Sequence, residues 1–397
     1  MNCAILAGEL FDGVHPEVKR DQVILTEGER IRAVGPRTEL RIPPGYRTLD
    51  YGNAFVSPGL VDTHLHLSIG GLPEDDEIRR EDNHLTILRC ANNARRELWG
   101  GVTTVREAGA KGILGITIRR AIREKIVPGP RILICGQPII ITGGHTHYMG
   151  VEADGPEAVR HAVRQQVKTG VDWVKIMATG GIMTPGMSFG APQMTRGEIA
   201  AAVEEAHRAG RKISAHANGE EGIRDCVEAG IDSIEHGIGV TEELAREMEQ
   251  RGTWYIPTLG AIHLIAVDGE KDGQSAQAVS KAKEAVPVHR RSFEAALGAR
   301  VRMAAGTDYK HPGLWLELRL MAEYGLAPAQ ALLLATGAAA EFLGMRPRVG
   351  TLEPGAFADV AAFGGNPLED FTRLQDVRLV MQGGELIIPC SGDSSVP

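Results

Sequence analysis

The sequence predicts an α/β protein: a (β/α)8 barrel of the TIM type, with a small β-sandwich domain built from both chain termini. Three observations predict this fold. Eight strand-length apolar runs alternate with helical stretches in the middle of the chain. Several of these runs end in polar residues, at the edge where barrel enzymes carry their catalytic groups. Both ends of the chain consist of short alternating runs and turns, which are typical of β-strands.

The two ends of the chain are predicted to form one small domain. Residues 1–57 alternate apolar and polar residues around glycine, and residues 349–397 repeat the pattern. A period of two indicates strands with one buried face. We therefore expect residues 1–57 and 349–397 to form a composite β-sandwich, and residues 58–348 to form the barrel.

The middle of the chain reads as repeated strand–helix units. The helical stretches, such as 155–170, 195–210 and 241–252, end in glycine as helix C-termini prefer. Eight repeats favour a closed barrel over an open doubly wound sheet, and the first run lacks the GxGxxG fingerprint of dinucleotide-binding sheets. The eight runs are VDTHLH, VTTVREAG, RILICGQPI, WVKIMATG, KISAHANG, SIEHG, TWYIPTL and VRMAAGTD.

The composition excludes several classes of protein. The 397 residues include 43 Lys and Arg against 51 Asp and Glu, a formal charge of −8 that argues against a nucleic-acid partner. No apolar run is long enough for a membrane span, and the N-terminus lacks the features of a signal peptide. The five cysteines are dispersed and form no CxxC pair. We expect a cytoplasmic homo-oligomer that acts on a small molecule, without nucleic acid or membrane as a partner.

Six polar residues mark the ends of five runs. The two in the first run, His64 and His66, are two positions apart, so both rings face one side of a strand. One polar residue at a strand end is an ordinary cap, but six on five strands indicate a shared site. Four imidazoles and a carboxylate suit Zn²⁺ or a similar divalent ion. The other four are Lys175 in the fourth run, His216 in the fifth, His236 in the sixth and Asp308 in the eighth.

Lys175 is unusual in such a set, because an ammonium group has no lone pair and repels a metal ion. It could bind a substrate carboxylate instead. It could also react with CO₂ and become an anionic ligand with two oxygens. The residues alone leave both roles open.

Together these residues resemble the amidohydrolase superfamily, and most of all its imidazolonepropionase-related and prolidase-like branch. The likeness extends from about residue 52 to residue 364. The family's fold is a (β/α)8 barrel beside a β-sandwich built from both chain ends, which agrees with the division above. The phrases that carry the likeness are VSPGLVDTHLH, GVTTVRE, VKIMATGG, SIEHG and GTLEPGAFADV.

The resemblance implies a site for two divalent metal ions, with zinc the expected metal, and hydrolysis of a C–N bond. His64, His66 and Asp308 would hold the more buried ion, whereas His216 and His236 would hold the more exposed one. N6-carboxylated Lys175 and a hydroxide would bridge the two ions, and the hydroxide would attack the substrate carbonyl. Asp308 would pass a proton to the leaving nitrogen.

Other residues are candidate substrate contacts. His145 and His147 follow the third run and could contact the substrate or stabilise the oxyanion, although a structural role is an equal alternative. Asn218 stands in the region where dipeptidases of the branch carry a Tyr, which weakens the dipeptide assignment, but its amide can still donate a hydrogen bond. The weaker pocket candidates are Tyr148, Tyr309 and His311.

The predicted reaction is hydrolysis of an amide or peptide-type bond in a dipeptide, an N-acyl amino acid or a xenobiotic amide. Carbamates and phenylureas are alternative substrates. A mononuclear deaminase is the alternative reaction, but such enzymes lack the strand-four Lys and often carry a Glu three residues after the strand-five His. Here the first acid, Glu220, comes four residues after His216. Intact ligand positions disfavour a non-catalytic binding protein.

The remaining features are predicted to be structural. GMSFG at 186–190 matches the nucleophile elbow of serine hydrolases, but it lacks the required strand and helix on either side. We expect loop 180–192 to be a lid with hinges at Gly180, Gly181 and Gly186. Arg106 is expected to form a structural ion pair. The run 74–81 and His84, His161, His207 and His289 are expected to be solvated.

Overall fold

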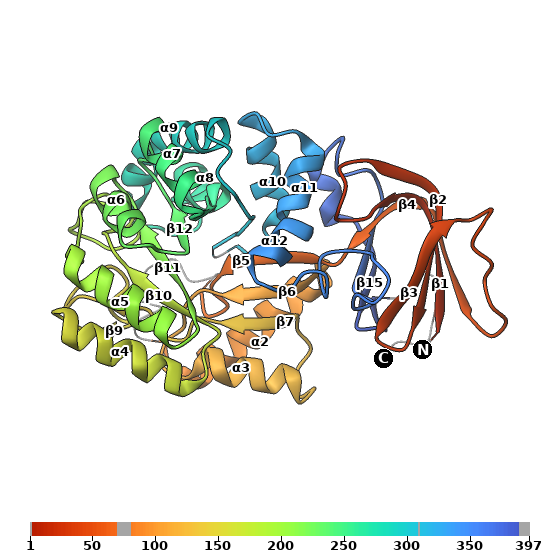
Figure 1. Ribbon diagram of the computed structural model, residues 1–397, viewed down its shortest axis with the longest axis horizontal. Helices are drawn as coiled ribbons and strands as arrows, with labels where there is room; N and C mark the ends of the chain where they lie inside the picture. The colour runs from red at the N-terminus through yellow and green to blue at the C-terminus, as the bar shows by residue number, and fades with distance from the viewer. Residues whose placement is uncertain (1, 70–80, 309, 389–397) are drawn as a thin grey trace.

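The computed structural model describes residues 2–69, 81–308 and 310–388. Parallel strands alternate with helices in the larger part, and a seven-stranded sheet lies beside it along the long axis of the molecule (Figure 1). The larger part has the strand and helix order of a TIM-type barrel. No helix in the described ranges combines the length and the apolar character needed to cross a membrane.

The seven-stranded sheet combines strands from both ends of the chain, in the order β16-β15-β14-β4-β1-β2-β3. Side chains of β1 alternate between two apolar clusters, with Ile5 in one and Leu6 in the other. The structure records one sheet here, so the two-sheet sandwich stays a prediction. The strands are β1 (Cys3–Phe11), β2 (Val18–Glu27), β3 (Arg30–Pro36), β4 (Arg47–Pro58), β14 (Val360–Phe363), β15 (Val377–Gln382) and β16 (Glu385–Ile388).

The first seven apolar runs contain parallel strands, as predicted. One sheet has the order β5-β6-β7, and a second has the order β13-β12-β11-β10-β8-β9. Because neighbouring strands are parallel, their C-terminal ends lie at one edge. The strands are β5 (Leu60–Leu65), β6 (Val102–Glu107), β7 (Arg131–Ile134), β8 (Ile139–Ile140), β9 (Val151–Glu152), β10 (Trp173–Met177), β11 (Lys212–Ala217), β12 (Ser233–His236) and β13 (Trp254–Ile256).

The eighth run, 301–308, is not a regular strand, contrary to the prediction. It forms single bridges instead, between Met303 and Tyr255 of β13 and between Asp308 and Leu65 of β5. Its positive φ of 69° at Asp308 is incompatible with extended backbone at that point. The run therefore lies between β13 and β5 while its last residue turns toward the strand ends.

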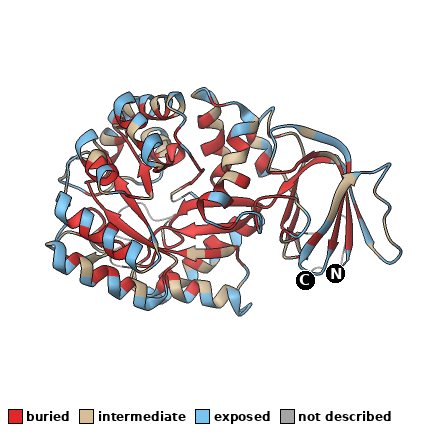
Figure 2. Cartoon of the chain, in the orientation of Figure 1, coloured by how far each residue is buried: buried red, intermediate tan, exposed pale blue. Residues whose placement is uncertain are grey.

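The sides of the helices that face the strands are buried, and their outer sides are exposed (Figure 2). Local signals explain their ends: Thr195 and Glu198 form a reciprocal capping box, and Gly170 ends a helix with φ 84°. The helices are α2 (Asn83–Trp99), α3 (Leu114–Arg123), α4 (Pro156–Thr169), α5 (Arg196–Arg208), α6 (Glu220–Glu228), α7 (Glu242–Arg251), α8 (Leu259–Asp268), α9 (Ala276–Gly298), α10 (Leu314–Glu323), α11 (Pro328–Leu334), α12 (Gly337–Phe342) and a 3₁₀ turn at Phe371–Gln375.

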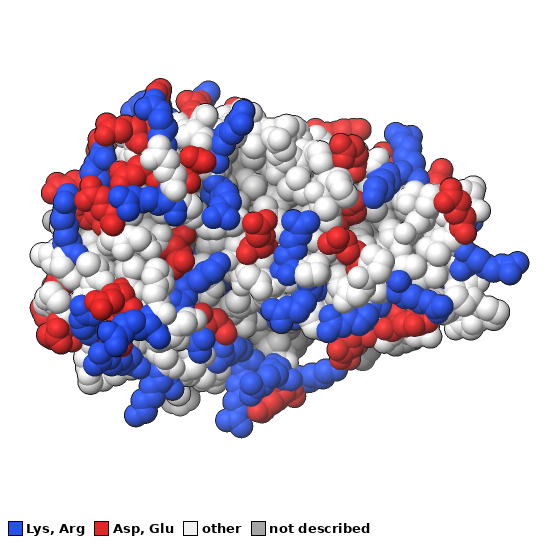
Figure 3. Space-filling model, viewed as in Figure 1, with Lys and Arg blue, Asp and Glu red and all other residues white. Residues whose placement is uncertain are grey.

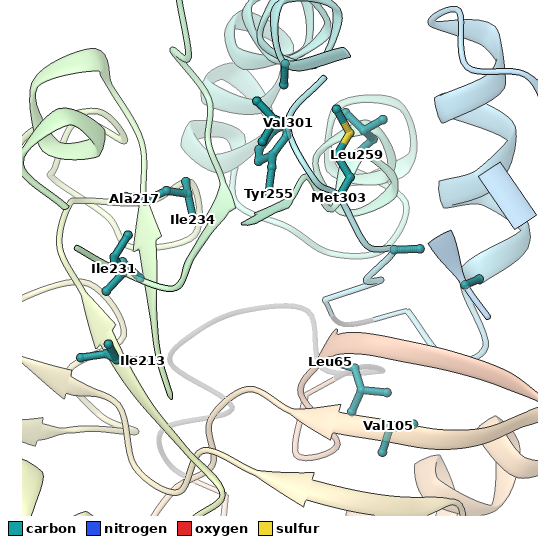
Figure 4. Packing of buried hydrophobic residues seen from close by; sticks show 14 of the residues in the cluster. Leu65, Val105, Ile213, Ala217, Ile231, Ile234, Tyr255, Leu259, Val301 and Met303 are labelled. Carbon is teal, nitrogen blue, oxygen red and sulfur yellow. The ribbon is translucent and has the colours of Figure 1, made fainter. Parts of the chain in front are cut away.

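The main core lies between strands and helices, and Figure 4 shows part of it. Leu65 of β5, Val105 of β6 and Ile213 of β11 are fully buried. Each such side chain contributes about 1.5–3 kcal/mol through removal from water. This apolar packing fixes the strands, so polar side chains at their C-terminal ends are held on a rigid frame.

The surface carries charges of both signs, and Figure 3 shows Lys and Arg interspersed with Asp and Glu on one face. Many of these charges pair along a helix, for example Arg251 with Glu247 at 2.9 Å. Exposed pairs of this kind each contribute about 0–1 kcal/mol. The surface pairs therefore add little to stability beside the apolar core.

Candidate metal centre and active site

The ends of β5 and of the 301–308 segment bring His64, His66 and Asp308 together. One donor atom from each of these side chains lies within 4.8 Å of the other two. Oδ1 of Asp308 is 3.6 Å from Nε2 of His64 and 3.5 Å from Nε2 of His66. The backbone N–H of Asp308 donates to the carbonyl of His64 at 2.8 Å, which anchors the carboxylate beside β5. Two imidazoles and one carboxylate at this spacing fit a divalent metal ion.

Hydrogen bonds outside the pocket decide which ring nitrogen can bind a metal. His66 Nδ1 lies 2.8 Å from the carbonyl of Gly109, and His216 Nε2 lies 2.9 Å from the carbonyl of Gly180. Because a carbonyl only accepts, each of these nitrogens carries the ring proton. The other nitrogen, Nε2 of His66 and Nδ1 of His216, keeps its lone pair for a metal ion.

His236 also has its ring proton fixed by a hydrogen bond. The hydroxyl of Thr258 donates to the carbonyl of Pro257 at 2.6 Å, so its oxygen accepts the proton on Nδ1 of His236, also at 2.6 Å. Nε2 of His236 therefore keeps its lone pair. His64 differs, because both of its ring nitrogens are buried and neither makes a hydrogen bond with the described residues. Such buried polar atoms need a partner, and a metal ion at Nε2 is one.

The imidazole rings form one continuous row across the strand ends. Ring centroids are 5.2 Å apart for His64 and His66, and 5.2 Å apart for His64 and His236. The next two spacings are 4.5 Å, from His236 to His216 and from His216 to His145. The structure thus brings together side chains that span residues 64 to 236 in the sequence.

Burial keeps these rings neutral at physiological pH. It lowers the pKa of His64 to about 4 and those of His66 and His145 to about 3. Burial also opposes ionisation of Asp308, but the neighbouring imidazoles of His64 and His66 and the basic group of Lys175 hold the pKa of that carboxyl well below its usual range. Neutral imidazole and ionised carboxylate are the forms that bind metals.

Beneath the row lies a buried charge cluster, of which the sequence predicted only an ion pair of Arg106. Glu235 contacts the ammonium of Lys175 through Oε2 and accepts a hydrogen bond from Arg106 through Oε1. All three side chains are fully buried. Arg106 also donates to the carbonyl of Thr63 at 2.6 Å and to the hydroxyl of Ser214 at 3.1 Å. The predicted structural ion pair of Arg106 is confirmed, with Glu235 as its partner.

Lys175 lies at the floor of the pocket, where its environment disfavours the charged form. Burial, and then the positive charge of Arg106, lower the pKa of Lys175 to about 7. A substantial share of neutral amine is then present at neutral pH. The neutral amine is the form that can react with CO₂.

A pocket opens above these groups. Its floor is polar, whereas its wall consists mainly of apolar side chains from loops and from α8. The predicted polar residues that line it are His66, His145, Lys175, His216, Asn218, His236 and Asp308. The apolar residues are Ile69, Met149, Met177, Ile182, Met183, Ile262 and Ile265.

Asn218 is held by its backbone neighbours. Its Oδ1 accepts the N–H of Ile238 at 3.1 Å, which turns its amide nitrogen to within 3.3 Å of Nε2 of His216. That ring nitrogen already carries a proton for Gly180, so it cannot accept from Asn218. The amide nitrogen therefore keeps a proton for another acceptor in the pocket.

The other predicted contacts divide into two groups. Tyr148 lines the pocket. His147 is not among the described lining residues, and its Nδ1 lies 3.3 Å from the carbonyl of Gly144. His311 is buried behind the site, with Nε2 3.2 Å from the carbonyl of His66 and Nδ1 2.7 Å from Glu97. Tyr309 lies outside the described residues.

One surface prediction is wrong. The sequence predicts a solvated His289, but its side chain is buried on the inner side of α9, because that side packs against the barrel. His84, His161 and His207 are exposed, as predicted. Of the charged run, residues 74–80 lie outside the described ranges, and Glu81 pairs with Arg89.

The GMSFG segment lies in a loop without a helix directly after it, so it does not form a nucleophile elbow. The loop ends meet where Thr179 bridges Pro192 and the N–H of Gly180 donates to the carbonyl of Ala191 at 2.9 Å. Ile182 and Met183 bring the loop into the pocket wall. Its function as a lid stays a prediction.

A barrel-type α/β fold with metal-ligating side chains at the strand ends is typical of metal-dependent hydrolases. The chain belongs to the amidohydrolase family, whose sequence profile matches residues 55–387. It is therefore a hydrolase of that superfamily, and the resemblance seen in the sequence is confirmed.

Individual relatives agree with this assignment. The chain is 30% identical to the ochratoxinase of Aspergillus niger, over 96% of this chain and 86% of that protein. It is 25% identical to the imidazolonepropionase of Pyrobaculum arsenaticum, over 86% of this chain and 84% of that protein. Among solved structures, a Xaa-Pro dipeptidase with methionine bound in its active site superposes with a TM-score of 0.91 at 30% identity, covering 98% of this chain and 100% of that chain.

Proposed function

We propose that the protein hydrolyses a C–N bond of amide or peptide type in a small molecule, with the aid of two divalent metal ions. The observation that carries the proposal is the row of neutral imidazoles beside Asp308 and Lys175 at the floor of one pocket. Hydrolases of amide-type bonds among the similar proteins, the Xaa-Pro dipeptidase and the ochratoxinase, support it.

Six side chains would hold the metal ions. His64, His66 and Asp308 form the more buried half of the site, and His216 and His236 form the other half. Lys175 would join the halves as its carbamate, which forms when the neutral amine adds to CO₂ and releases a proton. When bound, the ions would act as Lewis acids and lower the pKa of water at the site.

The protein's own groups would then move the protons of the reaction. A carboxylate oxygen of Asp308 would accept a proton from the water that attacks the carbonyl carbon. The same oxygen would give this proton to the leaving nitrogen when the C–N bond breaks. The products are a carboxylic acid and an amine.

Two neutral donors would stabilise the developing negative charge on the carbonyl oxygen. Asn218 presents an amide N–H to the pocket, and His145 presents its ring beside His216. Preorganised donors of this kind act most strongly where water is excluded. Both side chains are almost fully buried, with exposed fractions of 1% and 5%.

The wall of the pocket favours substrates with a bulky apolar group. Seven apolar side chains surround the polar floor, and three of them are methionines, which adapt to varied shapes. An N-acyl amino acid, an apolar dipeptide or a xenobiotic amide would place its side group there. Carbamates and phenylureas, which share the scissile carbonyl–nitrogen bond, are the second candidate class.

A substrate panel tests the proposal. Purified protein would be incubated with dipeptides, N-acyl amino acids, carbamates, phenylureas and amino-heterocycles, and amine and ammonia release would be measured separately. We expect amine release and close to two divalent ions per chain by elemental analysis. Ammonia release from amino-heterocycles, or a reproducible value near one ion, would contradict the binuclear hydrolase.

A further inference from the structure

His145 is held by the loop 180–192 on several sides. Its Nδ1 lies 2.7 Å from the hydroxyl oxygen of Thr184, and its ring lies directly over Gly181, where an added Cβ would come within 2.3 Å of Nε2. Its backbone N–H donates to the side chain of Gln193, the residue directly after the loop, at 3.0 Å. The position of this ring therefore depends on the position of the loop.

The loop is in turn fastened to α9 by Lys281. The ammonium of Lys281 donates to the carbonyl of Thr184 at 2.7 Å and lies 3.3 Å and 3.4 Å from the carbonyls of Ile182 and Gly181. Ile182 also packs against Ile262 of α8 in an apolar cluster. One side chain on α9 thus fixes the backbone of residues 181–184.

The contact with Thr184 sets the position of the ring proton of His145 differently from that of the candidate metal ligands. The hydroxyl oxygen of Thr184 accepts the N–H of Thr146 at 3.3 Å. Among the described residues, Nδ1 of His145 is the atom placed to accept the hydroxyl proton of Thr184. Nδ1 therefore accepts, and Nε2 carries the ring proton. His66, His216 and His236 instead donate outward and keep their inner lone pairs.

We propose that Lys281 is a positioning residue for the hydrolysis. By fixing the carbonyl of Thr184, it places the Thr184 hydroxyl so that His145 keeps its proton on Nε2 and can donate to the substrate's carbonyl oxygen. The two bonds of this chain, Lys281 to Thr184 and Thr184 to His145, are each 2.7 Å long. The inference rests on the proposed function for the role of His145, but the tautomer can be measured without any substrate.

The first experiment compares kcat, KM and metal content in Lys281→Met, Lys281→Arg and the parent. Met removes the donors and keeps the length, and we expect kcat to fall about tenfold to a hundredfold. Metal content should stay unchanged, because Lys281 bonds none of the candidate ligands. Arg restores N–H donors and should recover most of kcat. Gln277→Ala is the matched control, since Gln277 accepts from Gly186 of the same loop at 3.3 Å and should leave kcat within about twofold.

A double variant tests whether Lys281 acts through His145. If it does, Lys281→Met combined with His145→Gln should be no slower than His145→Gln alone. The inference would be overturned if the reductions in kcat from the two substitutions multiplied in the double variant. An unchanged kcat in Lys281→Met would also overturn it. Loss of metal in Lys281→Met would also overturn it, because the effect would then be on the metal site.

The second experiment is independent of activity. Long-range ¹H–¹⁵N spectra of the zinc-loaded, ¹⁵N-histidine protein distinguish the two neutral tautomers, and the signals of His145 are assigned by their loss in His145→Gln. We expect the Nε2–H form in the parent and in Lys281→Arg, and a mixture in Lys281→Met. An unchanged tautomer in Lys281→Met refutes the positioning role. A parent that releases no amine from any substrate refutes the proposed function instead.

Discussion

Nδ1 of His64 lies 3.2 Å from Oε2 of Glu235, in a part of the barrel that is closed to solvent. Glu235 comes from β12, next to His236, and reaches below the candidate metal site to contact Lys175 and Arg106. It therefore links one predicted metal ligand on β5 with the buried basic side chains of Lys175 and Arg106. A carboxylate in this place lies against His64 and balances the charge of Arg106, which would otherwise be unpaired.

We expect Glu235→Gln to destabilise the protein strongly. The substitution keeps the shape but leaves Arg106 without its carboxylate in a buried place, where loss of one partner costs about 3–5 kcal/mol. Glu247→Gln is the control, because the exposed Arg251–Glu247 pair should contribute less than about 1 kcal/mol. Urea unfolding of both variants checks the difference. Equal losses of unfolding free energy in the two variants would show that the buried pair contributes no more to stability than the exposed one.

Lys175→Ala should lose both metal and activity. The variant lacks the amine that would form the carbamate, so the two halves of the site lose their common ligand. Short carboxylic acids added to the variant should restore part of the activity by occupying the same place. Elemental analysis and amine release measure the two effects. Full activity without added acid would refute the bridging role of Lys175.

Asp308→Asn should retain some metal and abolish detectable turnover. The amide oxygen can still coordinate a metal ion, but it cannot accept the proton of the attacking water. Loss of a general base reduces the rate by about 10²–10⁴-fold. Metal content and kcat, measured on the same sample, separate the two functions. Activity equal to that of the parent would remove Asp308 as the proton carrier.

Gly181→Ala should reduce activity without unfolding the protein. An added Cβ would lie 2.3 Å from the ring of His145, which must then move. We expect a fall in kcat of about tenfold or more, because small displacements of a donor weaken transition-state binding. Gly298→Ala in α9 is the control, since nothing lies within 4 Å of its added Cβ. Similar kinetics in the two variants would contradict the close packing of the loop on His145.

Glu317→Gln should change how stability depends on pH. Oε2 of Glu317 accepts the N–H of Gly260 at 2.7 Å, and burial raises the pKa of this carboxyl from 4.5 to about 8. The folded protein thus keeps a proton that the unfolded chain loses between these values, so the contribution of Glu317 to stability falls as pH rises through this window.

Gln does not titrate, so the stability of Glu317→Gln relative to the parent should increase from about pH 5 to about pH 8. The gain should amount to a few kcal/mol, at about 1.4 kcal/mol per pKa unit. Urea unfolding of both proteins in chelator, at several pH values, measures it. A difference that does not change with pH would contradict the raised pKa of Glu317.

The sequence by itself determined the local geometry of the site. The two-residue spacing of His64 and His66 places both rings on one side of β5, because side chains alternate along a strand. Helical periodicity and terminal glycine likewise located α4 and α7 within one or two residues of their observed bounds. These features depend on covalent geometry and on neighbours close in the chain, so one sequence suffices to predict them.

Only the tertiary structure decided which other groups join the site. Glu235 faces the interior of the barrel, so strand alternation predicts that its neighbour His236 faces outward. The φ of 66° at His236 instead turns its ring toward the row of imidazoles. In the same way, the backbone turns at Thr146, where φ is 56°, and of the two flanking histidines only His145 is among the described residues that line the pocket.

Contacts between distant segments explain the remaining differences. Thr184 contacts His145 from 39 positions away along the chain, Lys281 contacts Thr184 from 97 positions away, and α9 turns His289 toward the barrel. Which side of a helix or loop meets a given strand depends on the packing of the whole barrel, and local patterns in the sequence do not contain that information.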